Sequence, residues 1–455
     1  MSQYLIDLAL FVLYLALMLW SFDRLPLFAH SSLSRRGLTA FFSLKLLFSV
    51  ATVLVYTYYY TDRATADIYK YFDDSRVIYA AIGEHPRTCF HVITGLGYDK
   101  DNPELKAVLA NTQHFDKKDA GIGEANNRLL IRLHVLLRFI SHGNVYIHTL
   151  FFCFLSFVGS VALYRALQPF FEYGQGRILI VPVFLVPSIL FWTSGMLKET
   201  LVMCFLGLMA FSAFRVLSFQ NIVTNLVLMV IWVLLMYLVK PFIALSFLAG
   251  FYVMATVNFK GLPRIITILL GIFIALGVLY LHQTFICEAM ASLIVKRNEF
   301  IHLGMAMNAG SLADTTIRDA TCTEPFKLIP TAIYNVFLQP ALWSHGAMNK
   351  LFGLENTLVL IFALVSLRYF KQPKRVKMQL AAFCLVFVVL NYGVVGITIP
   401  IIGALVRYKV FGLLFFLILT LSNVSIRKFI SDIKRIPAAE KWLAGSAKFV
   451  FNRTL

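Results

Sequence analysis

The sequence predicts an all-α, polytopic integral membrane protein with about 11 transmembrane helices and with outer loops that contain juxtamembrane amphipathic helices. Two observations lead to this fold class. Hydrophobic residues make up 59% of the 455 residues and charged residues only 14%, and the apolar residues gather in long runs. A soluble domain is roughly 45–50% apolar and about 25% charged. The composition therefore excludes an ordinary water-soluble globule.

Each predicted helix is an apolar run near the roughly 20 residues that cross a bilayer core. The runs cover residues 4–20, 41–60, 146–167, 178–191, 201–217, 222–238, 242–257, 265–281, 354–370, 380–395 and 410–421. The fourth and the last are short. The first run lacks a basic n-region and a small-residue cleavage site, so we expect a retained helix.

The runs also divide the chain into regions. These are two N-terminal helices in 1–60, an outer (periplasmic) loop in 61–145, transmembrane helices in 146–282, a second outer loop in 283–353, the C-terminal helices in 354–425 and a basic cytoplasmic tail in 426–455.

The net charge of +18 is distributed unevenly among these regions. If the N-terminus faces out, the inner segments carry 21 Lys and Arg residues against four acidic residues, whereas the two long outer segments are neutral. Short basic loops resist translocation, which predicts a multi-pass protein of the cell (inner) membrane with its N-terminus outside and its C-terminus in the cytoplasm. Because orientation accounts for the positive charge, we expect membrane lipid and no nucleic acid as partners.

The first outer loop begins with an acidic stretch. If it is helical, Asp67, Tyr71 and Asp74 share one face just above the bilayer. An acidic group there could act as a general base or hold a divalent cation such as Mg or Mn against a diphosphate. The alternative is a solvated helix start whose dipole favours carboxylates.

The same loop ends in a predicted amphipathic helix over 124–138. Arg128, Arg132, His134 and Arg138 lie on one side and leucines on the other, which is typical of a helix lying flat on a membrane. Its cationic side would meet lipid phosphates, and Arg128 could instead bind a substrate phosphate. The intervening residues 84–123 predict an irregular outer subdomain.

Cysteines and sequence motifs add less information. Cys287 and Cys322 could form a disulfide in the second outer loop, which would leave Cys89 unpaired. The histidine spacings do not match a metal-ligand motif. The sequence contains no Walker A, GxSxG, HExxH or dinucleotide-binding motif, so nothing indicates chemistry driven by a soluble nucleotide.

Two stretches place charge at membrane depth. Pro187 and Gly195 bracket a short span that turns back at Lys198 and Glu199, which are costly to bury unless they face a cavity or a partner. Lys198 could bind a phosphate or diphosphate, with Glu199 holding it in position or acting as an acid or base. Alternatively, the two residues neutralise each other at a helix start.

The second stretch is 393–409, where Gly and Pro interrupt an apolar sequence and predict a broken or re-entrant helix pair. Arg407 is its only arginine, and a guanidinium suits bidentate phosphate recognition. Snorkelling to the outer headgroups is the alternative. Lys240 is a third cation at the outer edge, and we expect it to be a snorkelling anchor.

These features together resemble the GT-C superfamily of polytopic glycosyltransferases. Two short patterns are similar to patterns in bacterial cell-surface polysaccharide membrane proteins: Pro187-Ser188-x-x-Phe191-Trp192-x-Ser194-Gly195-x-x-Lys198-Glu199 and Gly403-Ala404-x-x-Arg407-Tyr408. The resemblance implies a polyprenyl-phosphate-linked sugar donor used on the outer face of the membrane. It also implies that Asp67, with Asp62 as the second choice, is the catalytic base or a metal ligand.

The leading hypothesis is therefore a membrane glycosyltransferase or polysaccharide polymerase. It would transfer sugar from a polyprenyl-linked donor to a glycan, lipid or protein acceptor, with Lys198 and Arg407 stabilising the departing phosphate. The rival is a transporter or flippase of a lipid-linked or anionic solute, which the broken helices favour. A third hypothesis is a non-catalytic assembly subunit whose cations bind anionic lipid.

Overall fold

The computed structural model describes residues 2–59, 63, 66–99, 101–115, 125–171, 175–281, 284–307, 309–344, 346–370, 375–425, 428 and 432. Over these ranges the regular structure is entirely helical, as predicted, with two isolated β-bridges and no strand. The α-helices are α1 (Ser2–Arg24), α2 (Pro26–Ala29), α3 (Arg35–Tyr58), α4 (Asp67–Ala80), α5 (Pro86–Thr94), α6 (Pro103–Leu109), α7 (Ala125–Ser141), α8 (Val145–Leu167), α9 (Pro187–Trp192), α10 (Lys198–Leu217), α11 (Ile222–Val239), α12 (Pro241–Asn258), α13 (Leu262–Leu281), α14 (Phe285–Ala306), α15 (Glu324–Lys327), α16 (Ile329–Leu338), α17 (Ala347–Leu367), α18 (Arg375–Thr398), α19 (Ile402–Tyr408) and α20 (Val410–Ser422).

Eight helices in the described ranges are long and apolar enough to cross a membrane, or nine if the bent pair α19 and α20 counts as one span. This confirms the polytopic membrane fold but not the predicted count of about 11. The apolar run 178–191 is not one long helix: the 3-10 helix η2 (Gln175–Leu179), the π-helix η3 (Val181–Leu185) and α9 divide it. Pro182 and Pro187 lie near the starts of η3 and α9, where a missing backbone N–H costs least.

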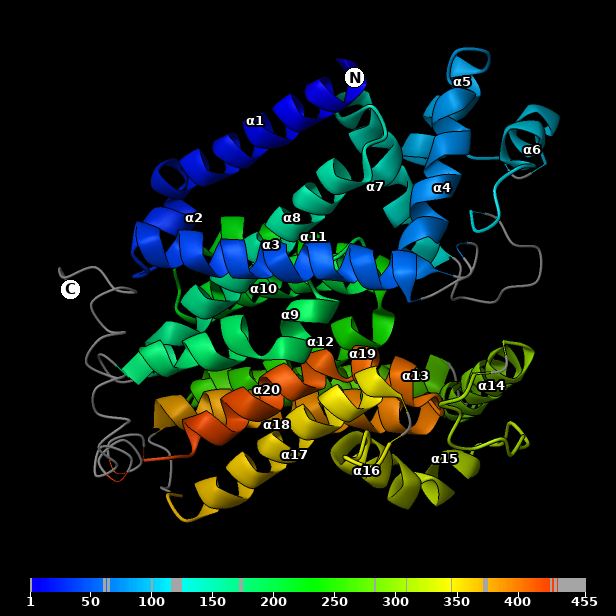
Figure 1. Cartoon of the computed structure of the whole chain (residues 1–455). Helices are drawn as coiled ribbons and strands as arrows, with labels where there is room; N and C mark the ends of the chain where they lie inside the picture. The colour runs from blue at the N-terminus through cyan, green and yellow to red at the C-terminus, as the bar shows by residue number, and fades with distance from the viewer. Residues whose placement is uncertain are drawn as a thin grey trace.

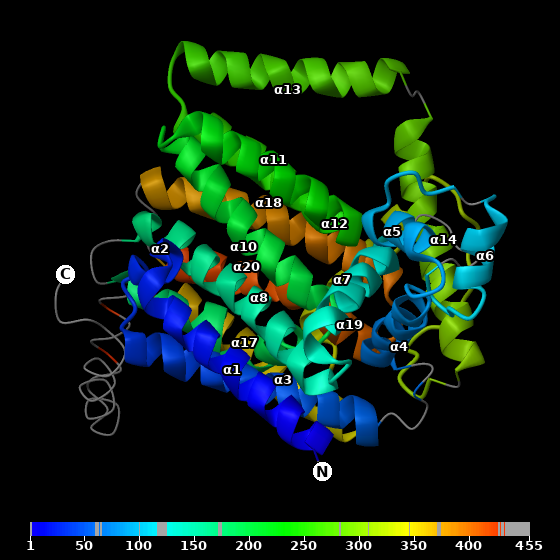
Figure 2. The same ribbon diagram turned by 90° about the horizontal axis from the view of Figure 1, so that it is seen from above.

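The spanning helices lie roughly parallel (Figure 1), and Figure 2 shows α13 apart from the rest of the bundle. Within the bundle, α8 packs against α10, and two glycines let the two backbones come close together. A Cβ atom on Gly207 would lie 1.8 Å from the carbonyl oxygen of Gly159, so no larger residue fits there. Small residues of this kind let helix backbones pack tightly in a membrane.

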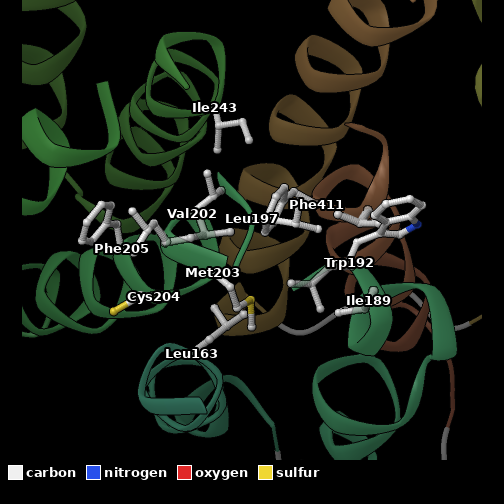
Figure 3. Packing of buried hydrophobic residues seen from close by; sticks show 14 of the residues in the cluster. Leu163, Ile189, Trp192, Leu197, Val202, Met203, Cys204, Phe205, Ile243 and Phe411 are labelled. Carbon is white, nitrogen blue, oxygen red and sulfur yellow. The ribbon is translucent and has the colours of Figure 1, made fainter. Parts of the chain in front are cut away.

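An apolar layer joins α10 to its neighbours. Figure 3 shows Leu197 and Val202 between Ile243 of α12 on one side and Trp192 and Phe411 on the other. All five side chains are buried. Since Leu197, Ile243 and Phe411 lie within four residues of charged positions, this layer holds those positions in place.

A polar seam connects α3 to the break between α9 and α10. Lys45 Nζ donates to Thr193 Oγ1 at 2.8 Å, and Ser49 Oγ donates to the Ser194 carbonyl at 2.7 Å. Thr52 Oγ1 donates to the Phe191 carbonyl at 3.2 Å. Lys45 is therefore a buried residue within α3.

The elements of the two predicted outer loops gather at one end of the bundle (Figure 1). Residues 84–123 include two short helices, α5 and α6, where an irregular segment was expected. A proline occupies the first turn of each, and the Asn102 side chain accepts hydrogen bonds from the backbone N–H groups of Glu104 and Leu105. These are ordinary helix-start signals.

Helix α7 forms where the amphipathic helix was predicted, but its polar face is not free to meet lipid. His134 and Arg138 are buried. Arg138 Nε donates to Ser75 Oγ at 2.8 Å and Nη2 to the Phe72 carbonyl at 2.6 Å, both on α4. The prediction of a flat, lipid-facing cationic helix is therefore wrong, because α4, α5 and Phe115 accept the hydrogen bonds of Arg138, Arg132 and Arg128, respectively.

The segment predicted to form the second outer loop contacts the helix break before α19. Leu312 forms an antiparallel bridge with Ile401, and the Ile402 N–H donates to the Ser311 carbonyl at 2.9 Å. Cys287 and Cys322 form a disulfide, as the sequence suggested, and Cys89 is free. The bridge to Ile401 and the hydrogen bond from Ile402 fix the position at which α19 begins.

Candidate functional site

Ionisable side chains from four parts of the chain meet at the end of the bundle that carries the outer elements. We define this charge cluster as Asp67, Lys198, Glu199, Lys240 and Arg407. Asp67 begins α4, Lys198 and Glu199 begin α10, Lys240 joins α11 to α12, and Arg407 is next to last in α19. Figure 2 shows α4, α7 and α19 gathered at this end.

Helix dipoles favour three of these five charges, whereas Lys198 begins α10, where the dipole disfavours a cation. Asp67 and Glu199 are in the first turns of α4 and α10, where the helix dipole stabilises negative charge. Arg407 is in the last turn of α19, where the dipole stabilises positive charge. Lys240 directly precedes Pro241, which starts α12.

Arg407 is the central residue of the cluster because it bridges both carboxylates. Its Nη1 pairs with Asp67 Oδ2, and its Nε lies 2.8 Å from Glu199 Oε2. The other Glu199 oxygen accepts a hydrogen bond from Lys240 Nζ at 2.6 Å. Arg407 thereby connects α4, in the first outer loop, to the spanning helix α10.

Two tyrosine rings and one further lysine surround these pairs. Lys240 Nζ lies 4.0 Å from the centroid of the Tyr408 ring, close enough for a cation–π interaction. Lys198 Nζ lies 5.9 Å from the centroid of the Tyr71 ring. Lys70 Nζ pairs with Asp67 Oδ1 at 3.2 Å at the rim of the cluster.

Burial makes the cluster electrostatically strong. Glu199, Lys240 and Arg407 are only 0%, 4% and 8% exposed, so water screens their charges weakly. Burial on its own would raise the pKa of the Asp67 carboxyl, but the neighbouring Arg407 and Lys70 hold it well below its usual range. Asp67 is therefore ionised at neutral pH and, as arranged here, is a weak base.

The cluster carries more positive than negative charge. The cluster contains two carboxylates and three cations. Asp67 pairs with Arg407 and with the rim residue Lys70, and Glu199 pairs with Arg407 and Lys240. Over the described ranges, Lys198 has no carboxylate within ion-pair distance. Its ammonium group is thus available to an anion from outside the chain.

The structure brings together four of the predicted site residues: Asp67, Lys198, Glu199 and Arg407. Arg128 lies elsewhere, in the first outer loop, where its Nε donates to the Phe115 carbonyl at 3.3 Å and its guanidinium lies over the Tyr98 ring. Asp62 is outside the described residues.

Two expectations about neighbouring charges are corrected. Lys240 is not a snorkelling anchor, because it is buried against Glu199. Glu199 pairs with Lys240 and Arg407 and not with the adjacent Lys198. Asp74, seven residues after Asp67 in α4, lies on the same helix face, as predicted, and accepts backbone hydrogen bonds from Gln113 at 2.9 Å and His114 at 2.7 Å.

Fold and site together define a polytopic helical membrane protein with a buried, mixed-charge site at one end of its spanning helices. No protein-family model, curated protein or solved structure matches the chain. The function is therefore inferred from the geometry and chemistry of the site.

Proposed function

We propose that this protein is a membrane glycosyltransferase or polysaccharide polymerase that takes a sugar from a polyprenyl-phosphate-linked donor and transfers it to an acceptor at the outer face of the membrane. The observation that carries the proposal is the meeting of Asp67, Lys198 and Arg407, which are far apart in sequence. A surplus of buried cations beside a carboxylate suits a reaction that releases a phosphate and removes a proton.

The proposed phosphate site consists of Arg407 and Lys198. A planar guanidinium can bind two phosphate oxygens at once, and the Lys198 ammonium adds a compact positive charge. Both would stabilise the negative charge that grows on the phosphate as the sugar leaves. The apolar surroundings suit the lipid tail of such a donor.

The proposed base is Asp67. With Arg407 beside it, the pKa of Asp67 is too low for efficient proton abstraction. A substrate phosphate on Arg407 would compete with Asp67 for the guanidinium, which raises the pKa of Asp67 toward its ordinary value. Substrate binding thus activates the base.

The chemical step balances with these residues. The acceptor hydroxyl oxygen forms a bond to the anomeric carbon, and its proton passes to Asp67. The bond from the anomeric carbon to the phosphate oxygen breaks, and its electron pair stays on the polyprenyl phosphate next to Lys198 and Arg407.

A divalent cation does not fit the site well. Among the described residues no group of three His, Cys, Asp or Glu side chains is arranged to hold a metal ion. Asp67 and Glu199, the carboxylates present, are already paired with cations. The proposed reaction therefore uses protein side chains alone.

The test is transfer of a labelled sugar from a polyprenyl-phosphate-linked donor in proteoliposomes. Asp67→Asn, Lys198→Met and Arg407→Ala should each reduce transfer by at least about 100-fold, the scale expected for loss of a general base or of a charge that stabilises the transition state. Lys296→Met, which removes an exposed outer cation, is the matched control and should keep full activity. Full activity in all three cluster variants refutes the proposal.

A second candidate is a transporter of a lipid-linked or anionic solute, because helix breaks surround the cluster. A break of residues 193–197 precedes α10, and α19 and α20 are bent by 54°. Broken helices of this kind form binding sites in transporters. Movement of the unmodified donor across the liposome membrane would favour this function. Loss of transfer in Arg407→Ala but not in Asp67→Asn would instead favour an enzyme that relies on arginine alone.

A further inference from the structure

A small pocket of about 230 Å³ lies next to the start of α19. Its lining includes Ser311 from the second outer loop, Gln339 and Ser344 from the turn between α16 and α17, Asn349 from α17 and Trp343. Trp343 is 79% exposed. The pocket lies outside the charge cluster, because it adjoins Ile402 at the start of α19, whereas Arg407 is near the end of that helix.

The chemistry of this pocket differs from that of the charge cluster. The described residues that line it carry amide, hydroxyl and apolar groups and no ionisable side chain. Amides and hydroxyls both donate and accept hydrogen bonds, as neighbouring sugar hydroxyls do. An indole face offers a flat apolar surface for the C–H face of a pyranose ring.

The size of the pocket limits its ligand. Pockets for drug-sized molecules measure roughly 300–1,000 Å³, so about 230 Å³ suits a single sugar residue and not a long glycan. An anion would gain no charge partner from the described lining. These properties select a neutral monosaccharide unit.

Side chains and backbone pairs connect the pocket rigidly to the charge cluster. Lys409, two residues after Arg407, donates to the carbonyls of Gln339 and of Val336, the latter at 3.1 Å, and to Asn356 Oδ1 at 2.9 Å. The wall at Ser311 is fastened by its backbone bond from Ile402. At about 1.5 Å per residue, Ile402 and Arg407 are roughly 8 Å apart along α19, which is comparable to the length of a sugar with its phosphate.

We propose that this pocket binds one neutral sugar residue of the substrate, held by Trp343 stacking and by the amide and hydroxyl groups of Gln339 and Ser344. The role of that sugar rests on the proposed glycosyl transfer, whereas its binding does not. The sugar belongs either to the donor, with its phosphate at Arg407, or to the end of the acceptor.

The experiment is saturation-transfer NMR on the full-length protein in detergent, with methyl glycosides of glucose, galactose, mannose and N-acetylglucosamine as probes. A monosaccharide held by a few hydrogen bonds binds with a Kd on the order of 1–10 mM. Trp343→Ala should weaken binding of the preferred probe about five- to ten-fold, the scale of one aromatic contact. Gln339→Met should also weaken it, and Trp20→Ala, which removes another exposed tryptophan, should not.

The corresponding sugar 1-phosphates distinguish the two sources of the sugar. If the pocket holds the donor sugar, the 1-phosphate should bind roughly ten-fold more tightly than the methyl glycoside, and Arg407→Ala should abolish that gain. If the pocket holds the acceptor sugar, the phosphate should add nothing.

The outcomes also separate this inference from the proposed function. No saturation transfer to any probe, or equal signals in Trp343→Ala and Trp20→Ala, overturns the sugar pocket and leaves Trp343 as a headgroup anchor. Sugar binding that depends on Trp343 without any glycosyl transfer would keep the pocket and refute the enzyme.

Discussion

Glu199 offers the sharpest test of the charge cluster as a structural unit. The substitution Glu199→Gln keeps the size of the side chain but removes its charge. Glu199 is fully buried and pairs with Lys240 at 2.6 Å and with Arg407 at 2.8 Å. Arg407 keeps Asp67 as a partner, whereas the ammonium of Lys240 loses its carboxylate.

The expected magnitude follows from that difference. Removing one partner of a buried ion pair costs about 3–5 kcal/mol, because the remaining charge is left uncompensated. We therefore expect Glu199→Gln to lower the free energy of unfolding by about that amount. Lys240→Met alone leaves Glu199 with Arg407 and should cost less. The double variant removes both charges of the pair and should be more stable than Glu199→Gln.

The assay is the midpoint temperature at which the detergent-solubilised protein loses its monodisperse chromatographic peak. Glu199→Gln should lower this midpoint by several degrees, and adding Lys240→Met should restore part of it. Glu199→Asp controls for a shortened but charged side chain. Strictly additive effects of the two substitutions would refute the coupling, and no effect of Glu199→Gln would show that the pair contributes nothing to folding.

Three further predictions concern other parts of the chain. Cys287 and Cys322 are 35 residues apart, so Cys287→Ser should cost roughly 3–4 kcal/mol by the chain-entropy model, with faster proteolysis of residues 284–328 as the measurement; unchanged proteolysis would contradict a stabilising role. Burial lowers the pKa of His134 well below its usual value, so the folded state excludes a proton that the unfolded chain binds. Stability should therefore be complete above about pH 6.5 and fall as the pH drops below it, and His134→Asn should flatten this dependence of the thermal midpoint. Gly207→Leu should abolish the close approach of α8 and α10 at Gly159 and prevent recovery of a monodisperse protein, whereas Gly277→Leu, where a Cβ meets nothing within 4 Å, should be tolerated.

The sequence was informative wherever a charged residue stood in an apolar context. Lys198, Glu199 and Arg407 could be selected in this way because charge at membrane depth requires a partner or a cavity. Lys240 could not be interpreted correctly, since a buried ion pair and a snorkelling side chain have the same local sequence. Its position directly before Pro241, at a helix start within an apolar stretch, was the available signal.

Two further predictions differ from the structure because the local sequence does not show the feature that decides the outcome. The sequence predicts that the polar face of α7 meets lipid phosphates, but α4 supplies hydroxyl and carbonyl acceptors for Arg138. The run 178–191 is apolar enough for a span, but periodicity alone does not reveal its helix breaks. Composition determines that a segment enters the membrane, whereas the segments that contact it determine how its side chains are placed there.

The pairing of Asp67 with Arg407 has a consequence for biosynthesis. The two residues are 340 positions apart, so at about 5–20 residues per second roughly 20–70 s separate their emergence from the ribosome. Of the two cations that pair with Asp67 in the described part of the chain, only Lys70 is already present on the nascent chain during that interval. The pair between α4 and α19 can therefore form only after α19 has been inserted, which makes arrival of the C-terminal helices the step that completes the site.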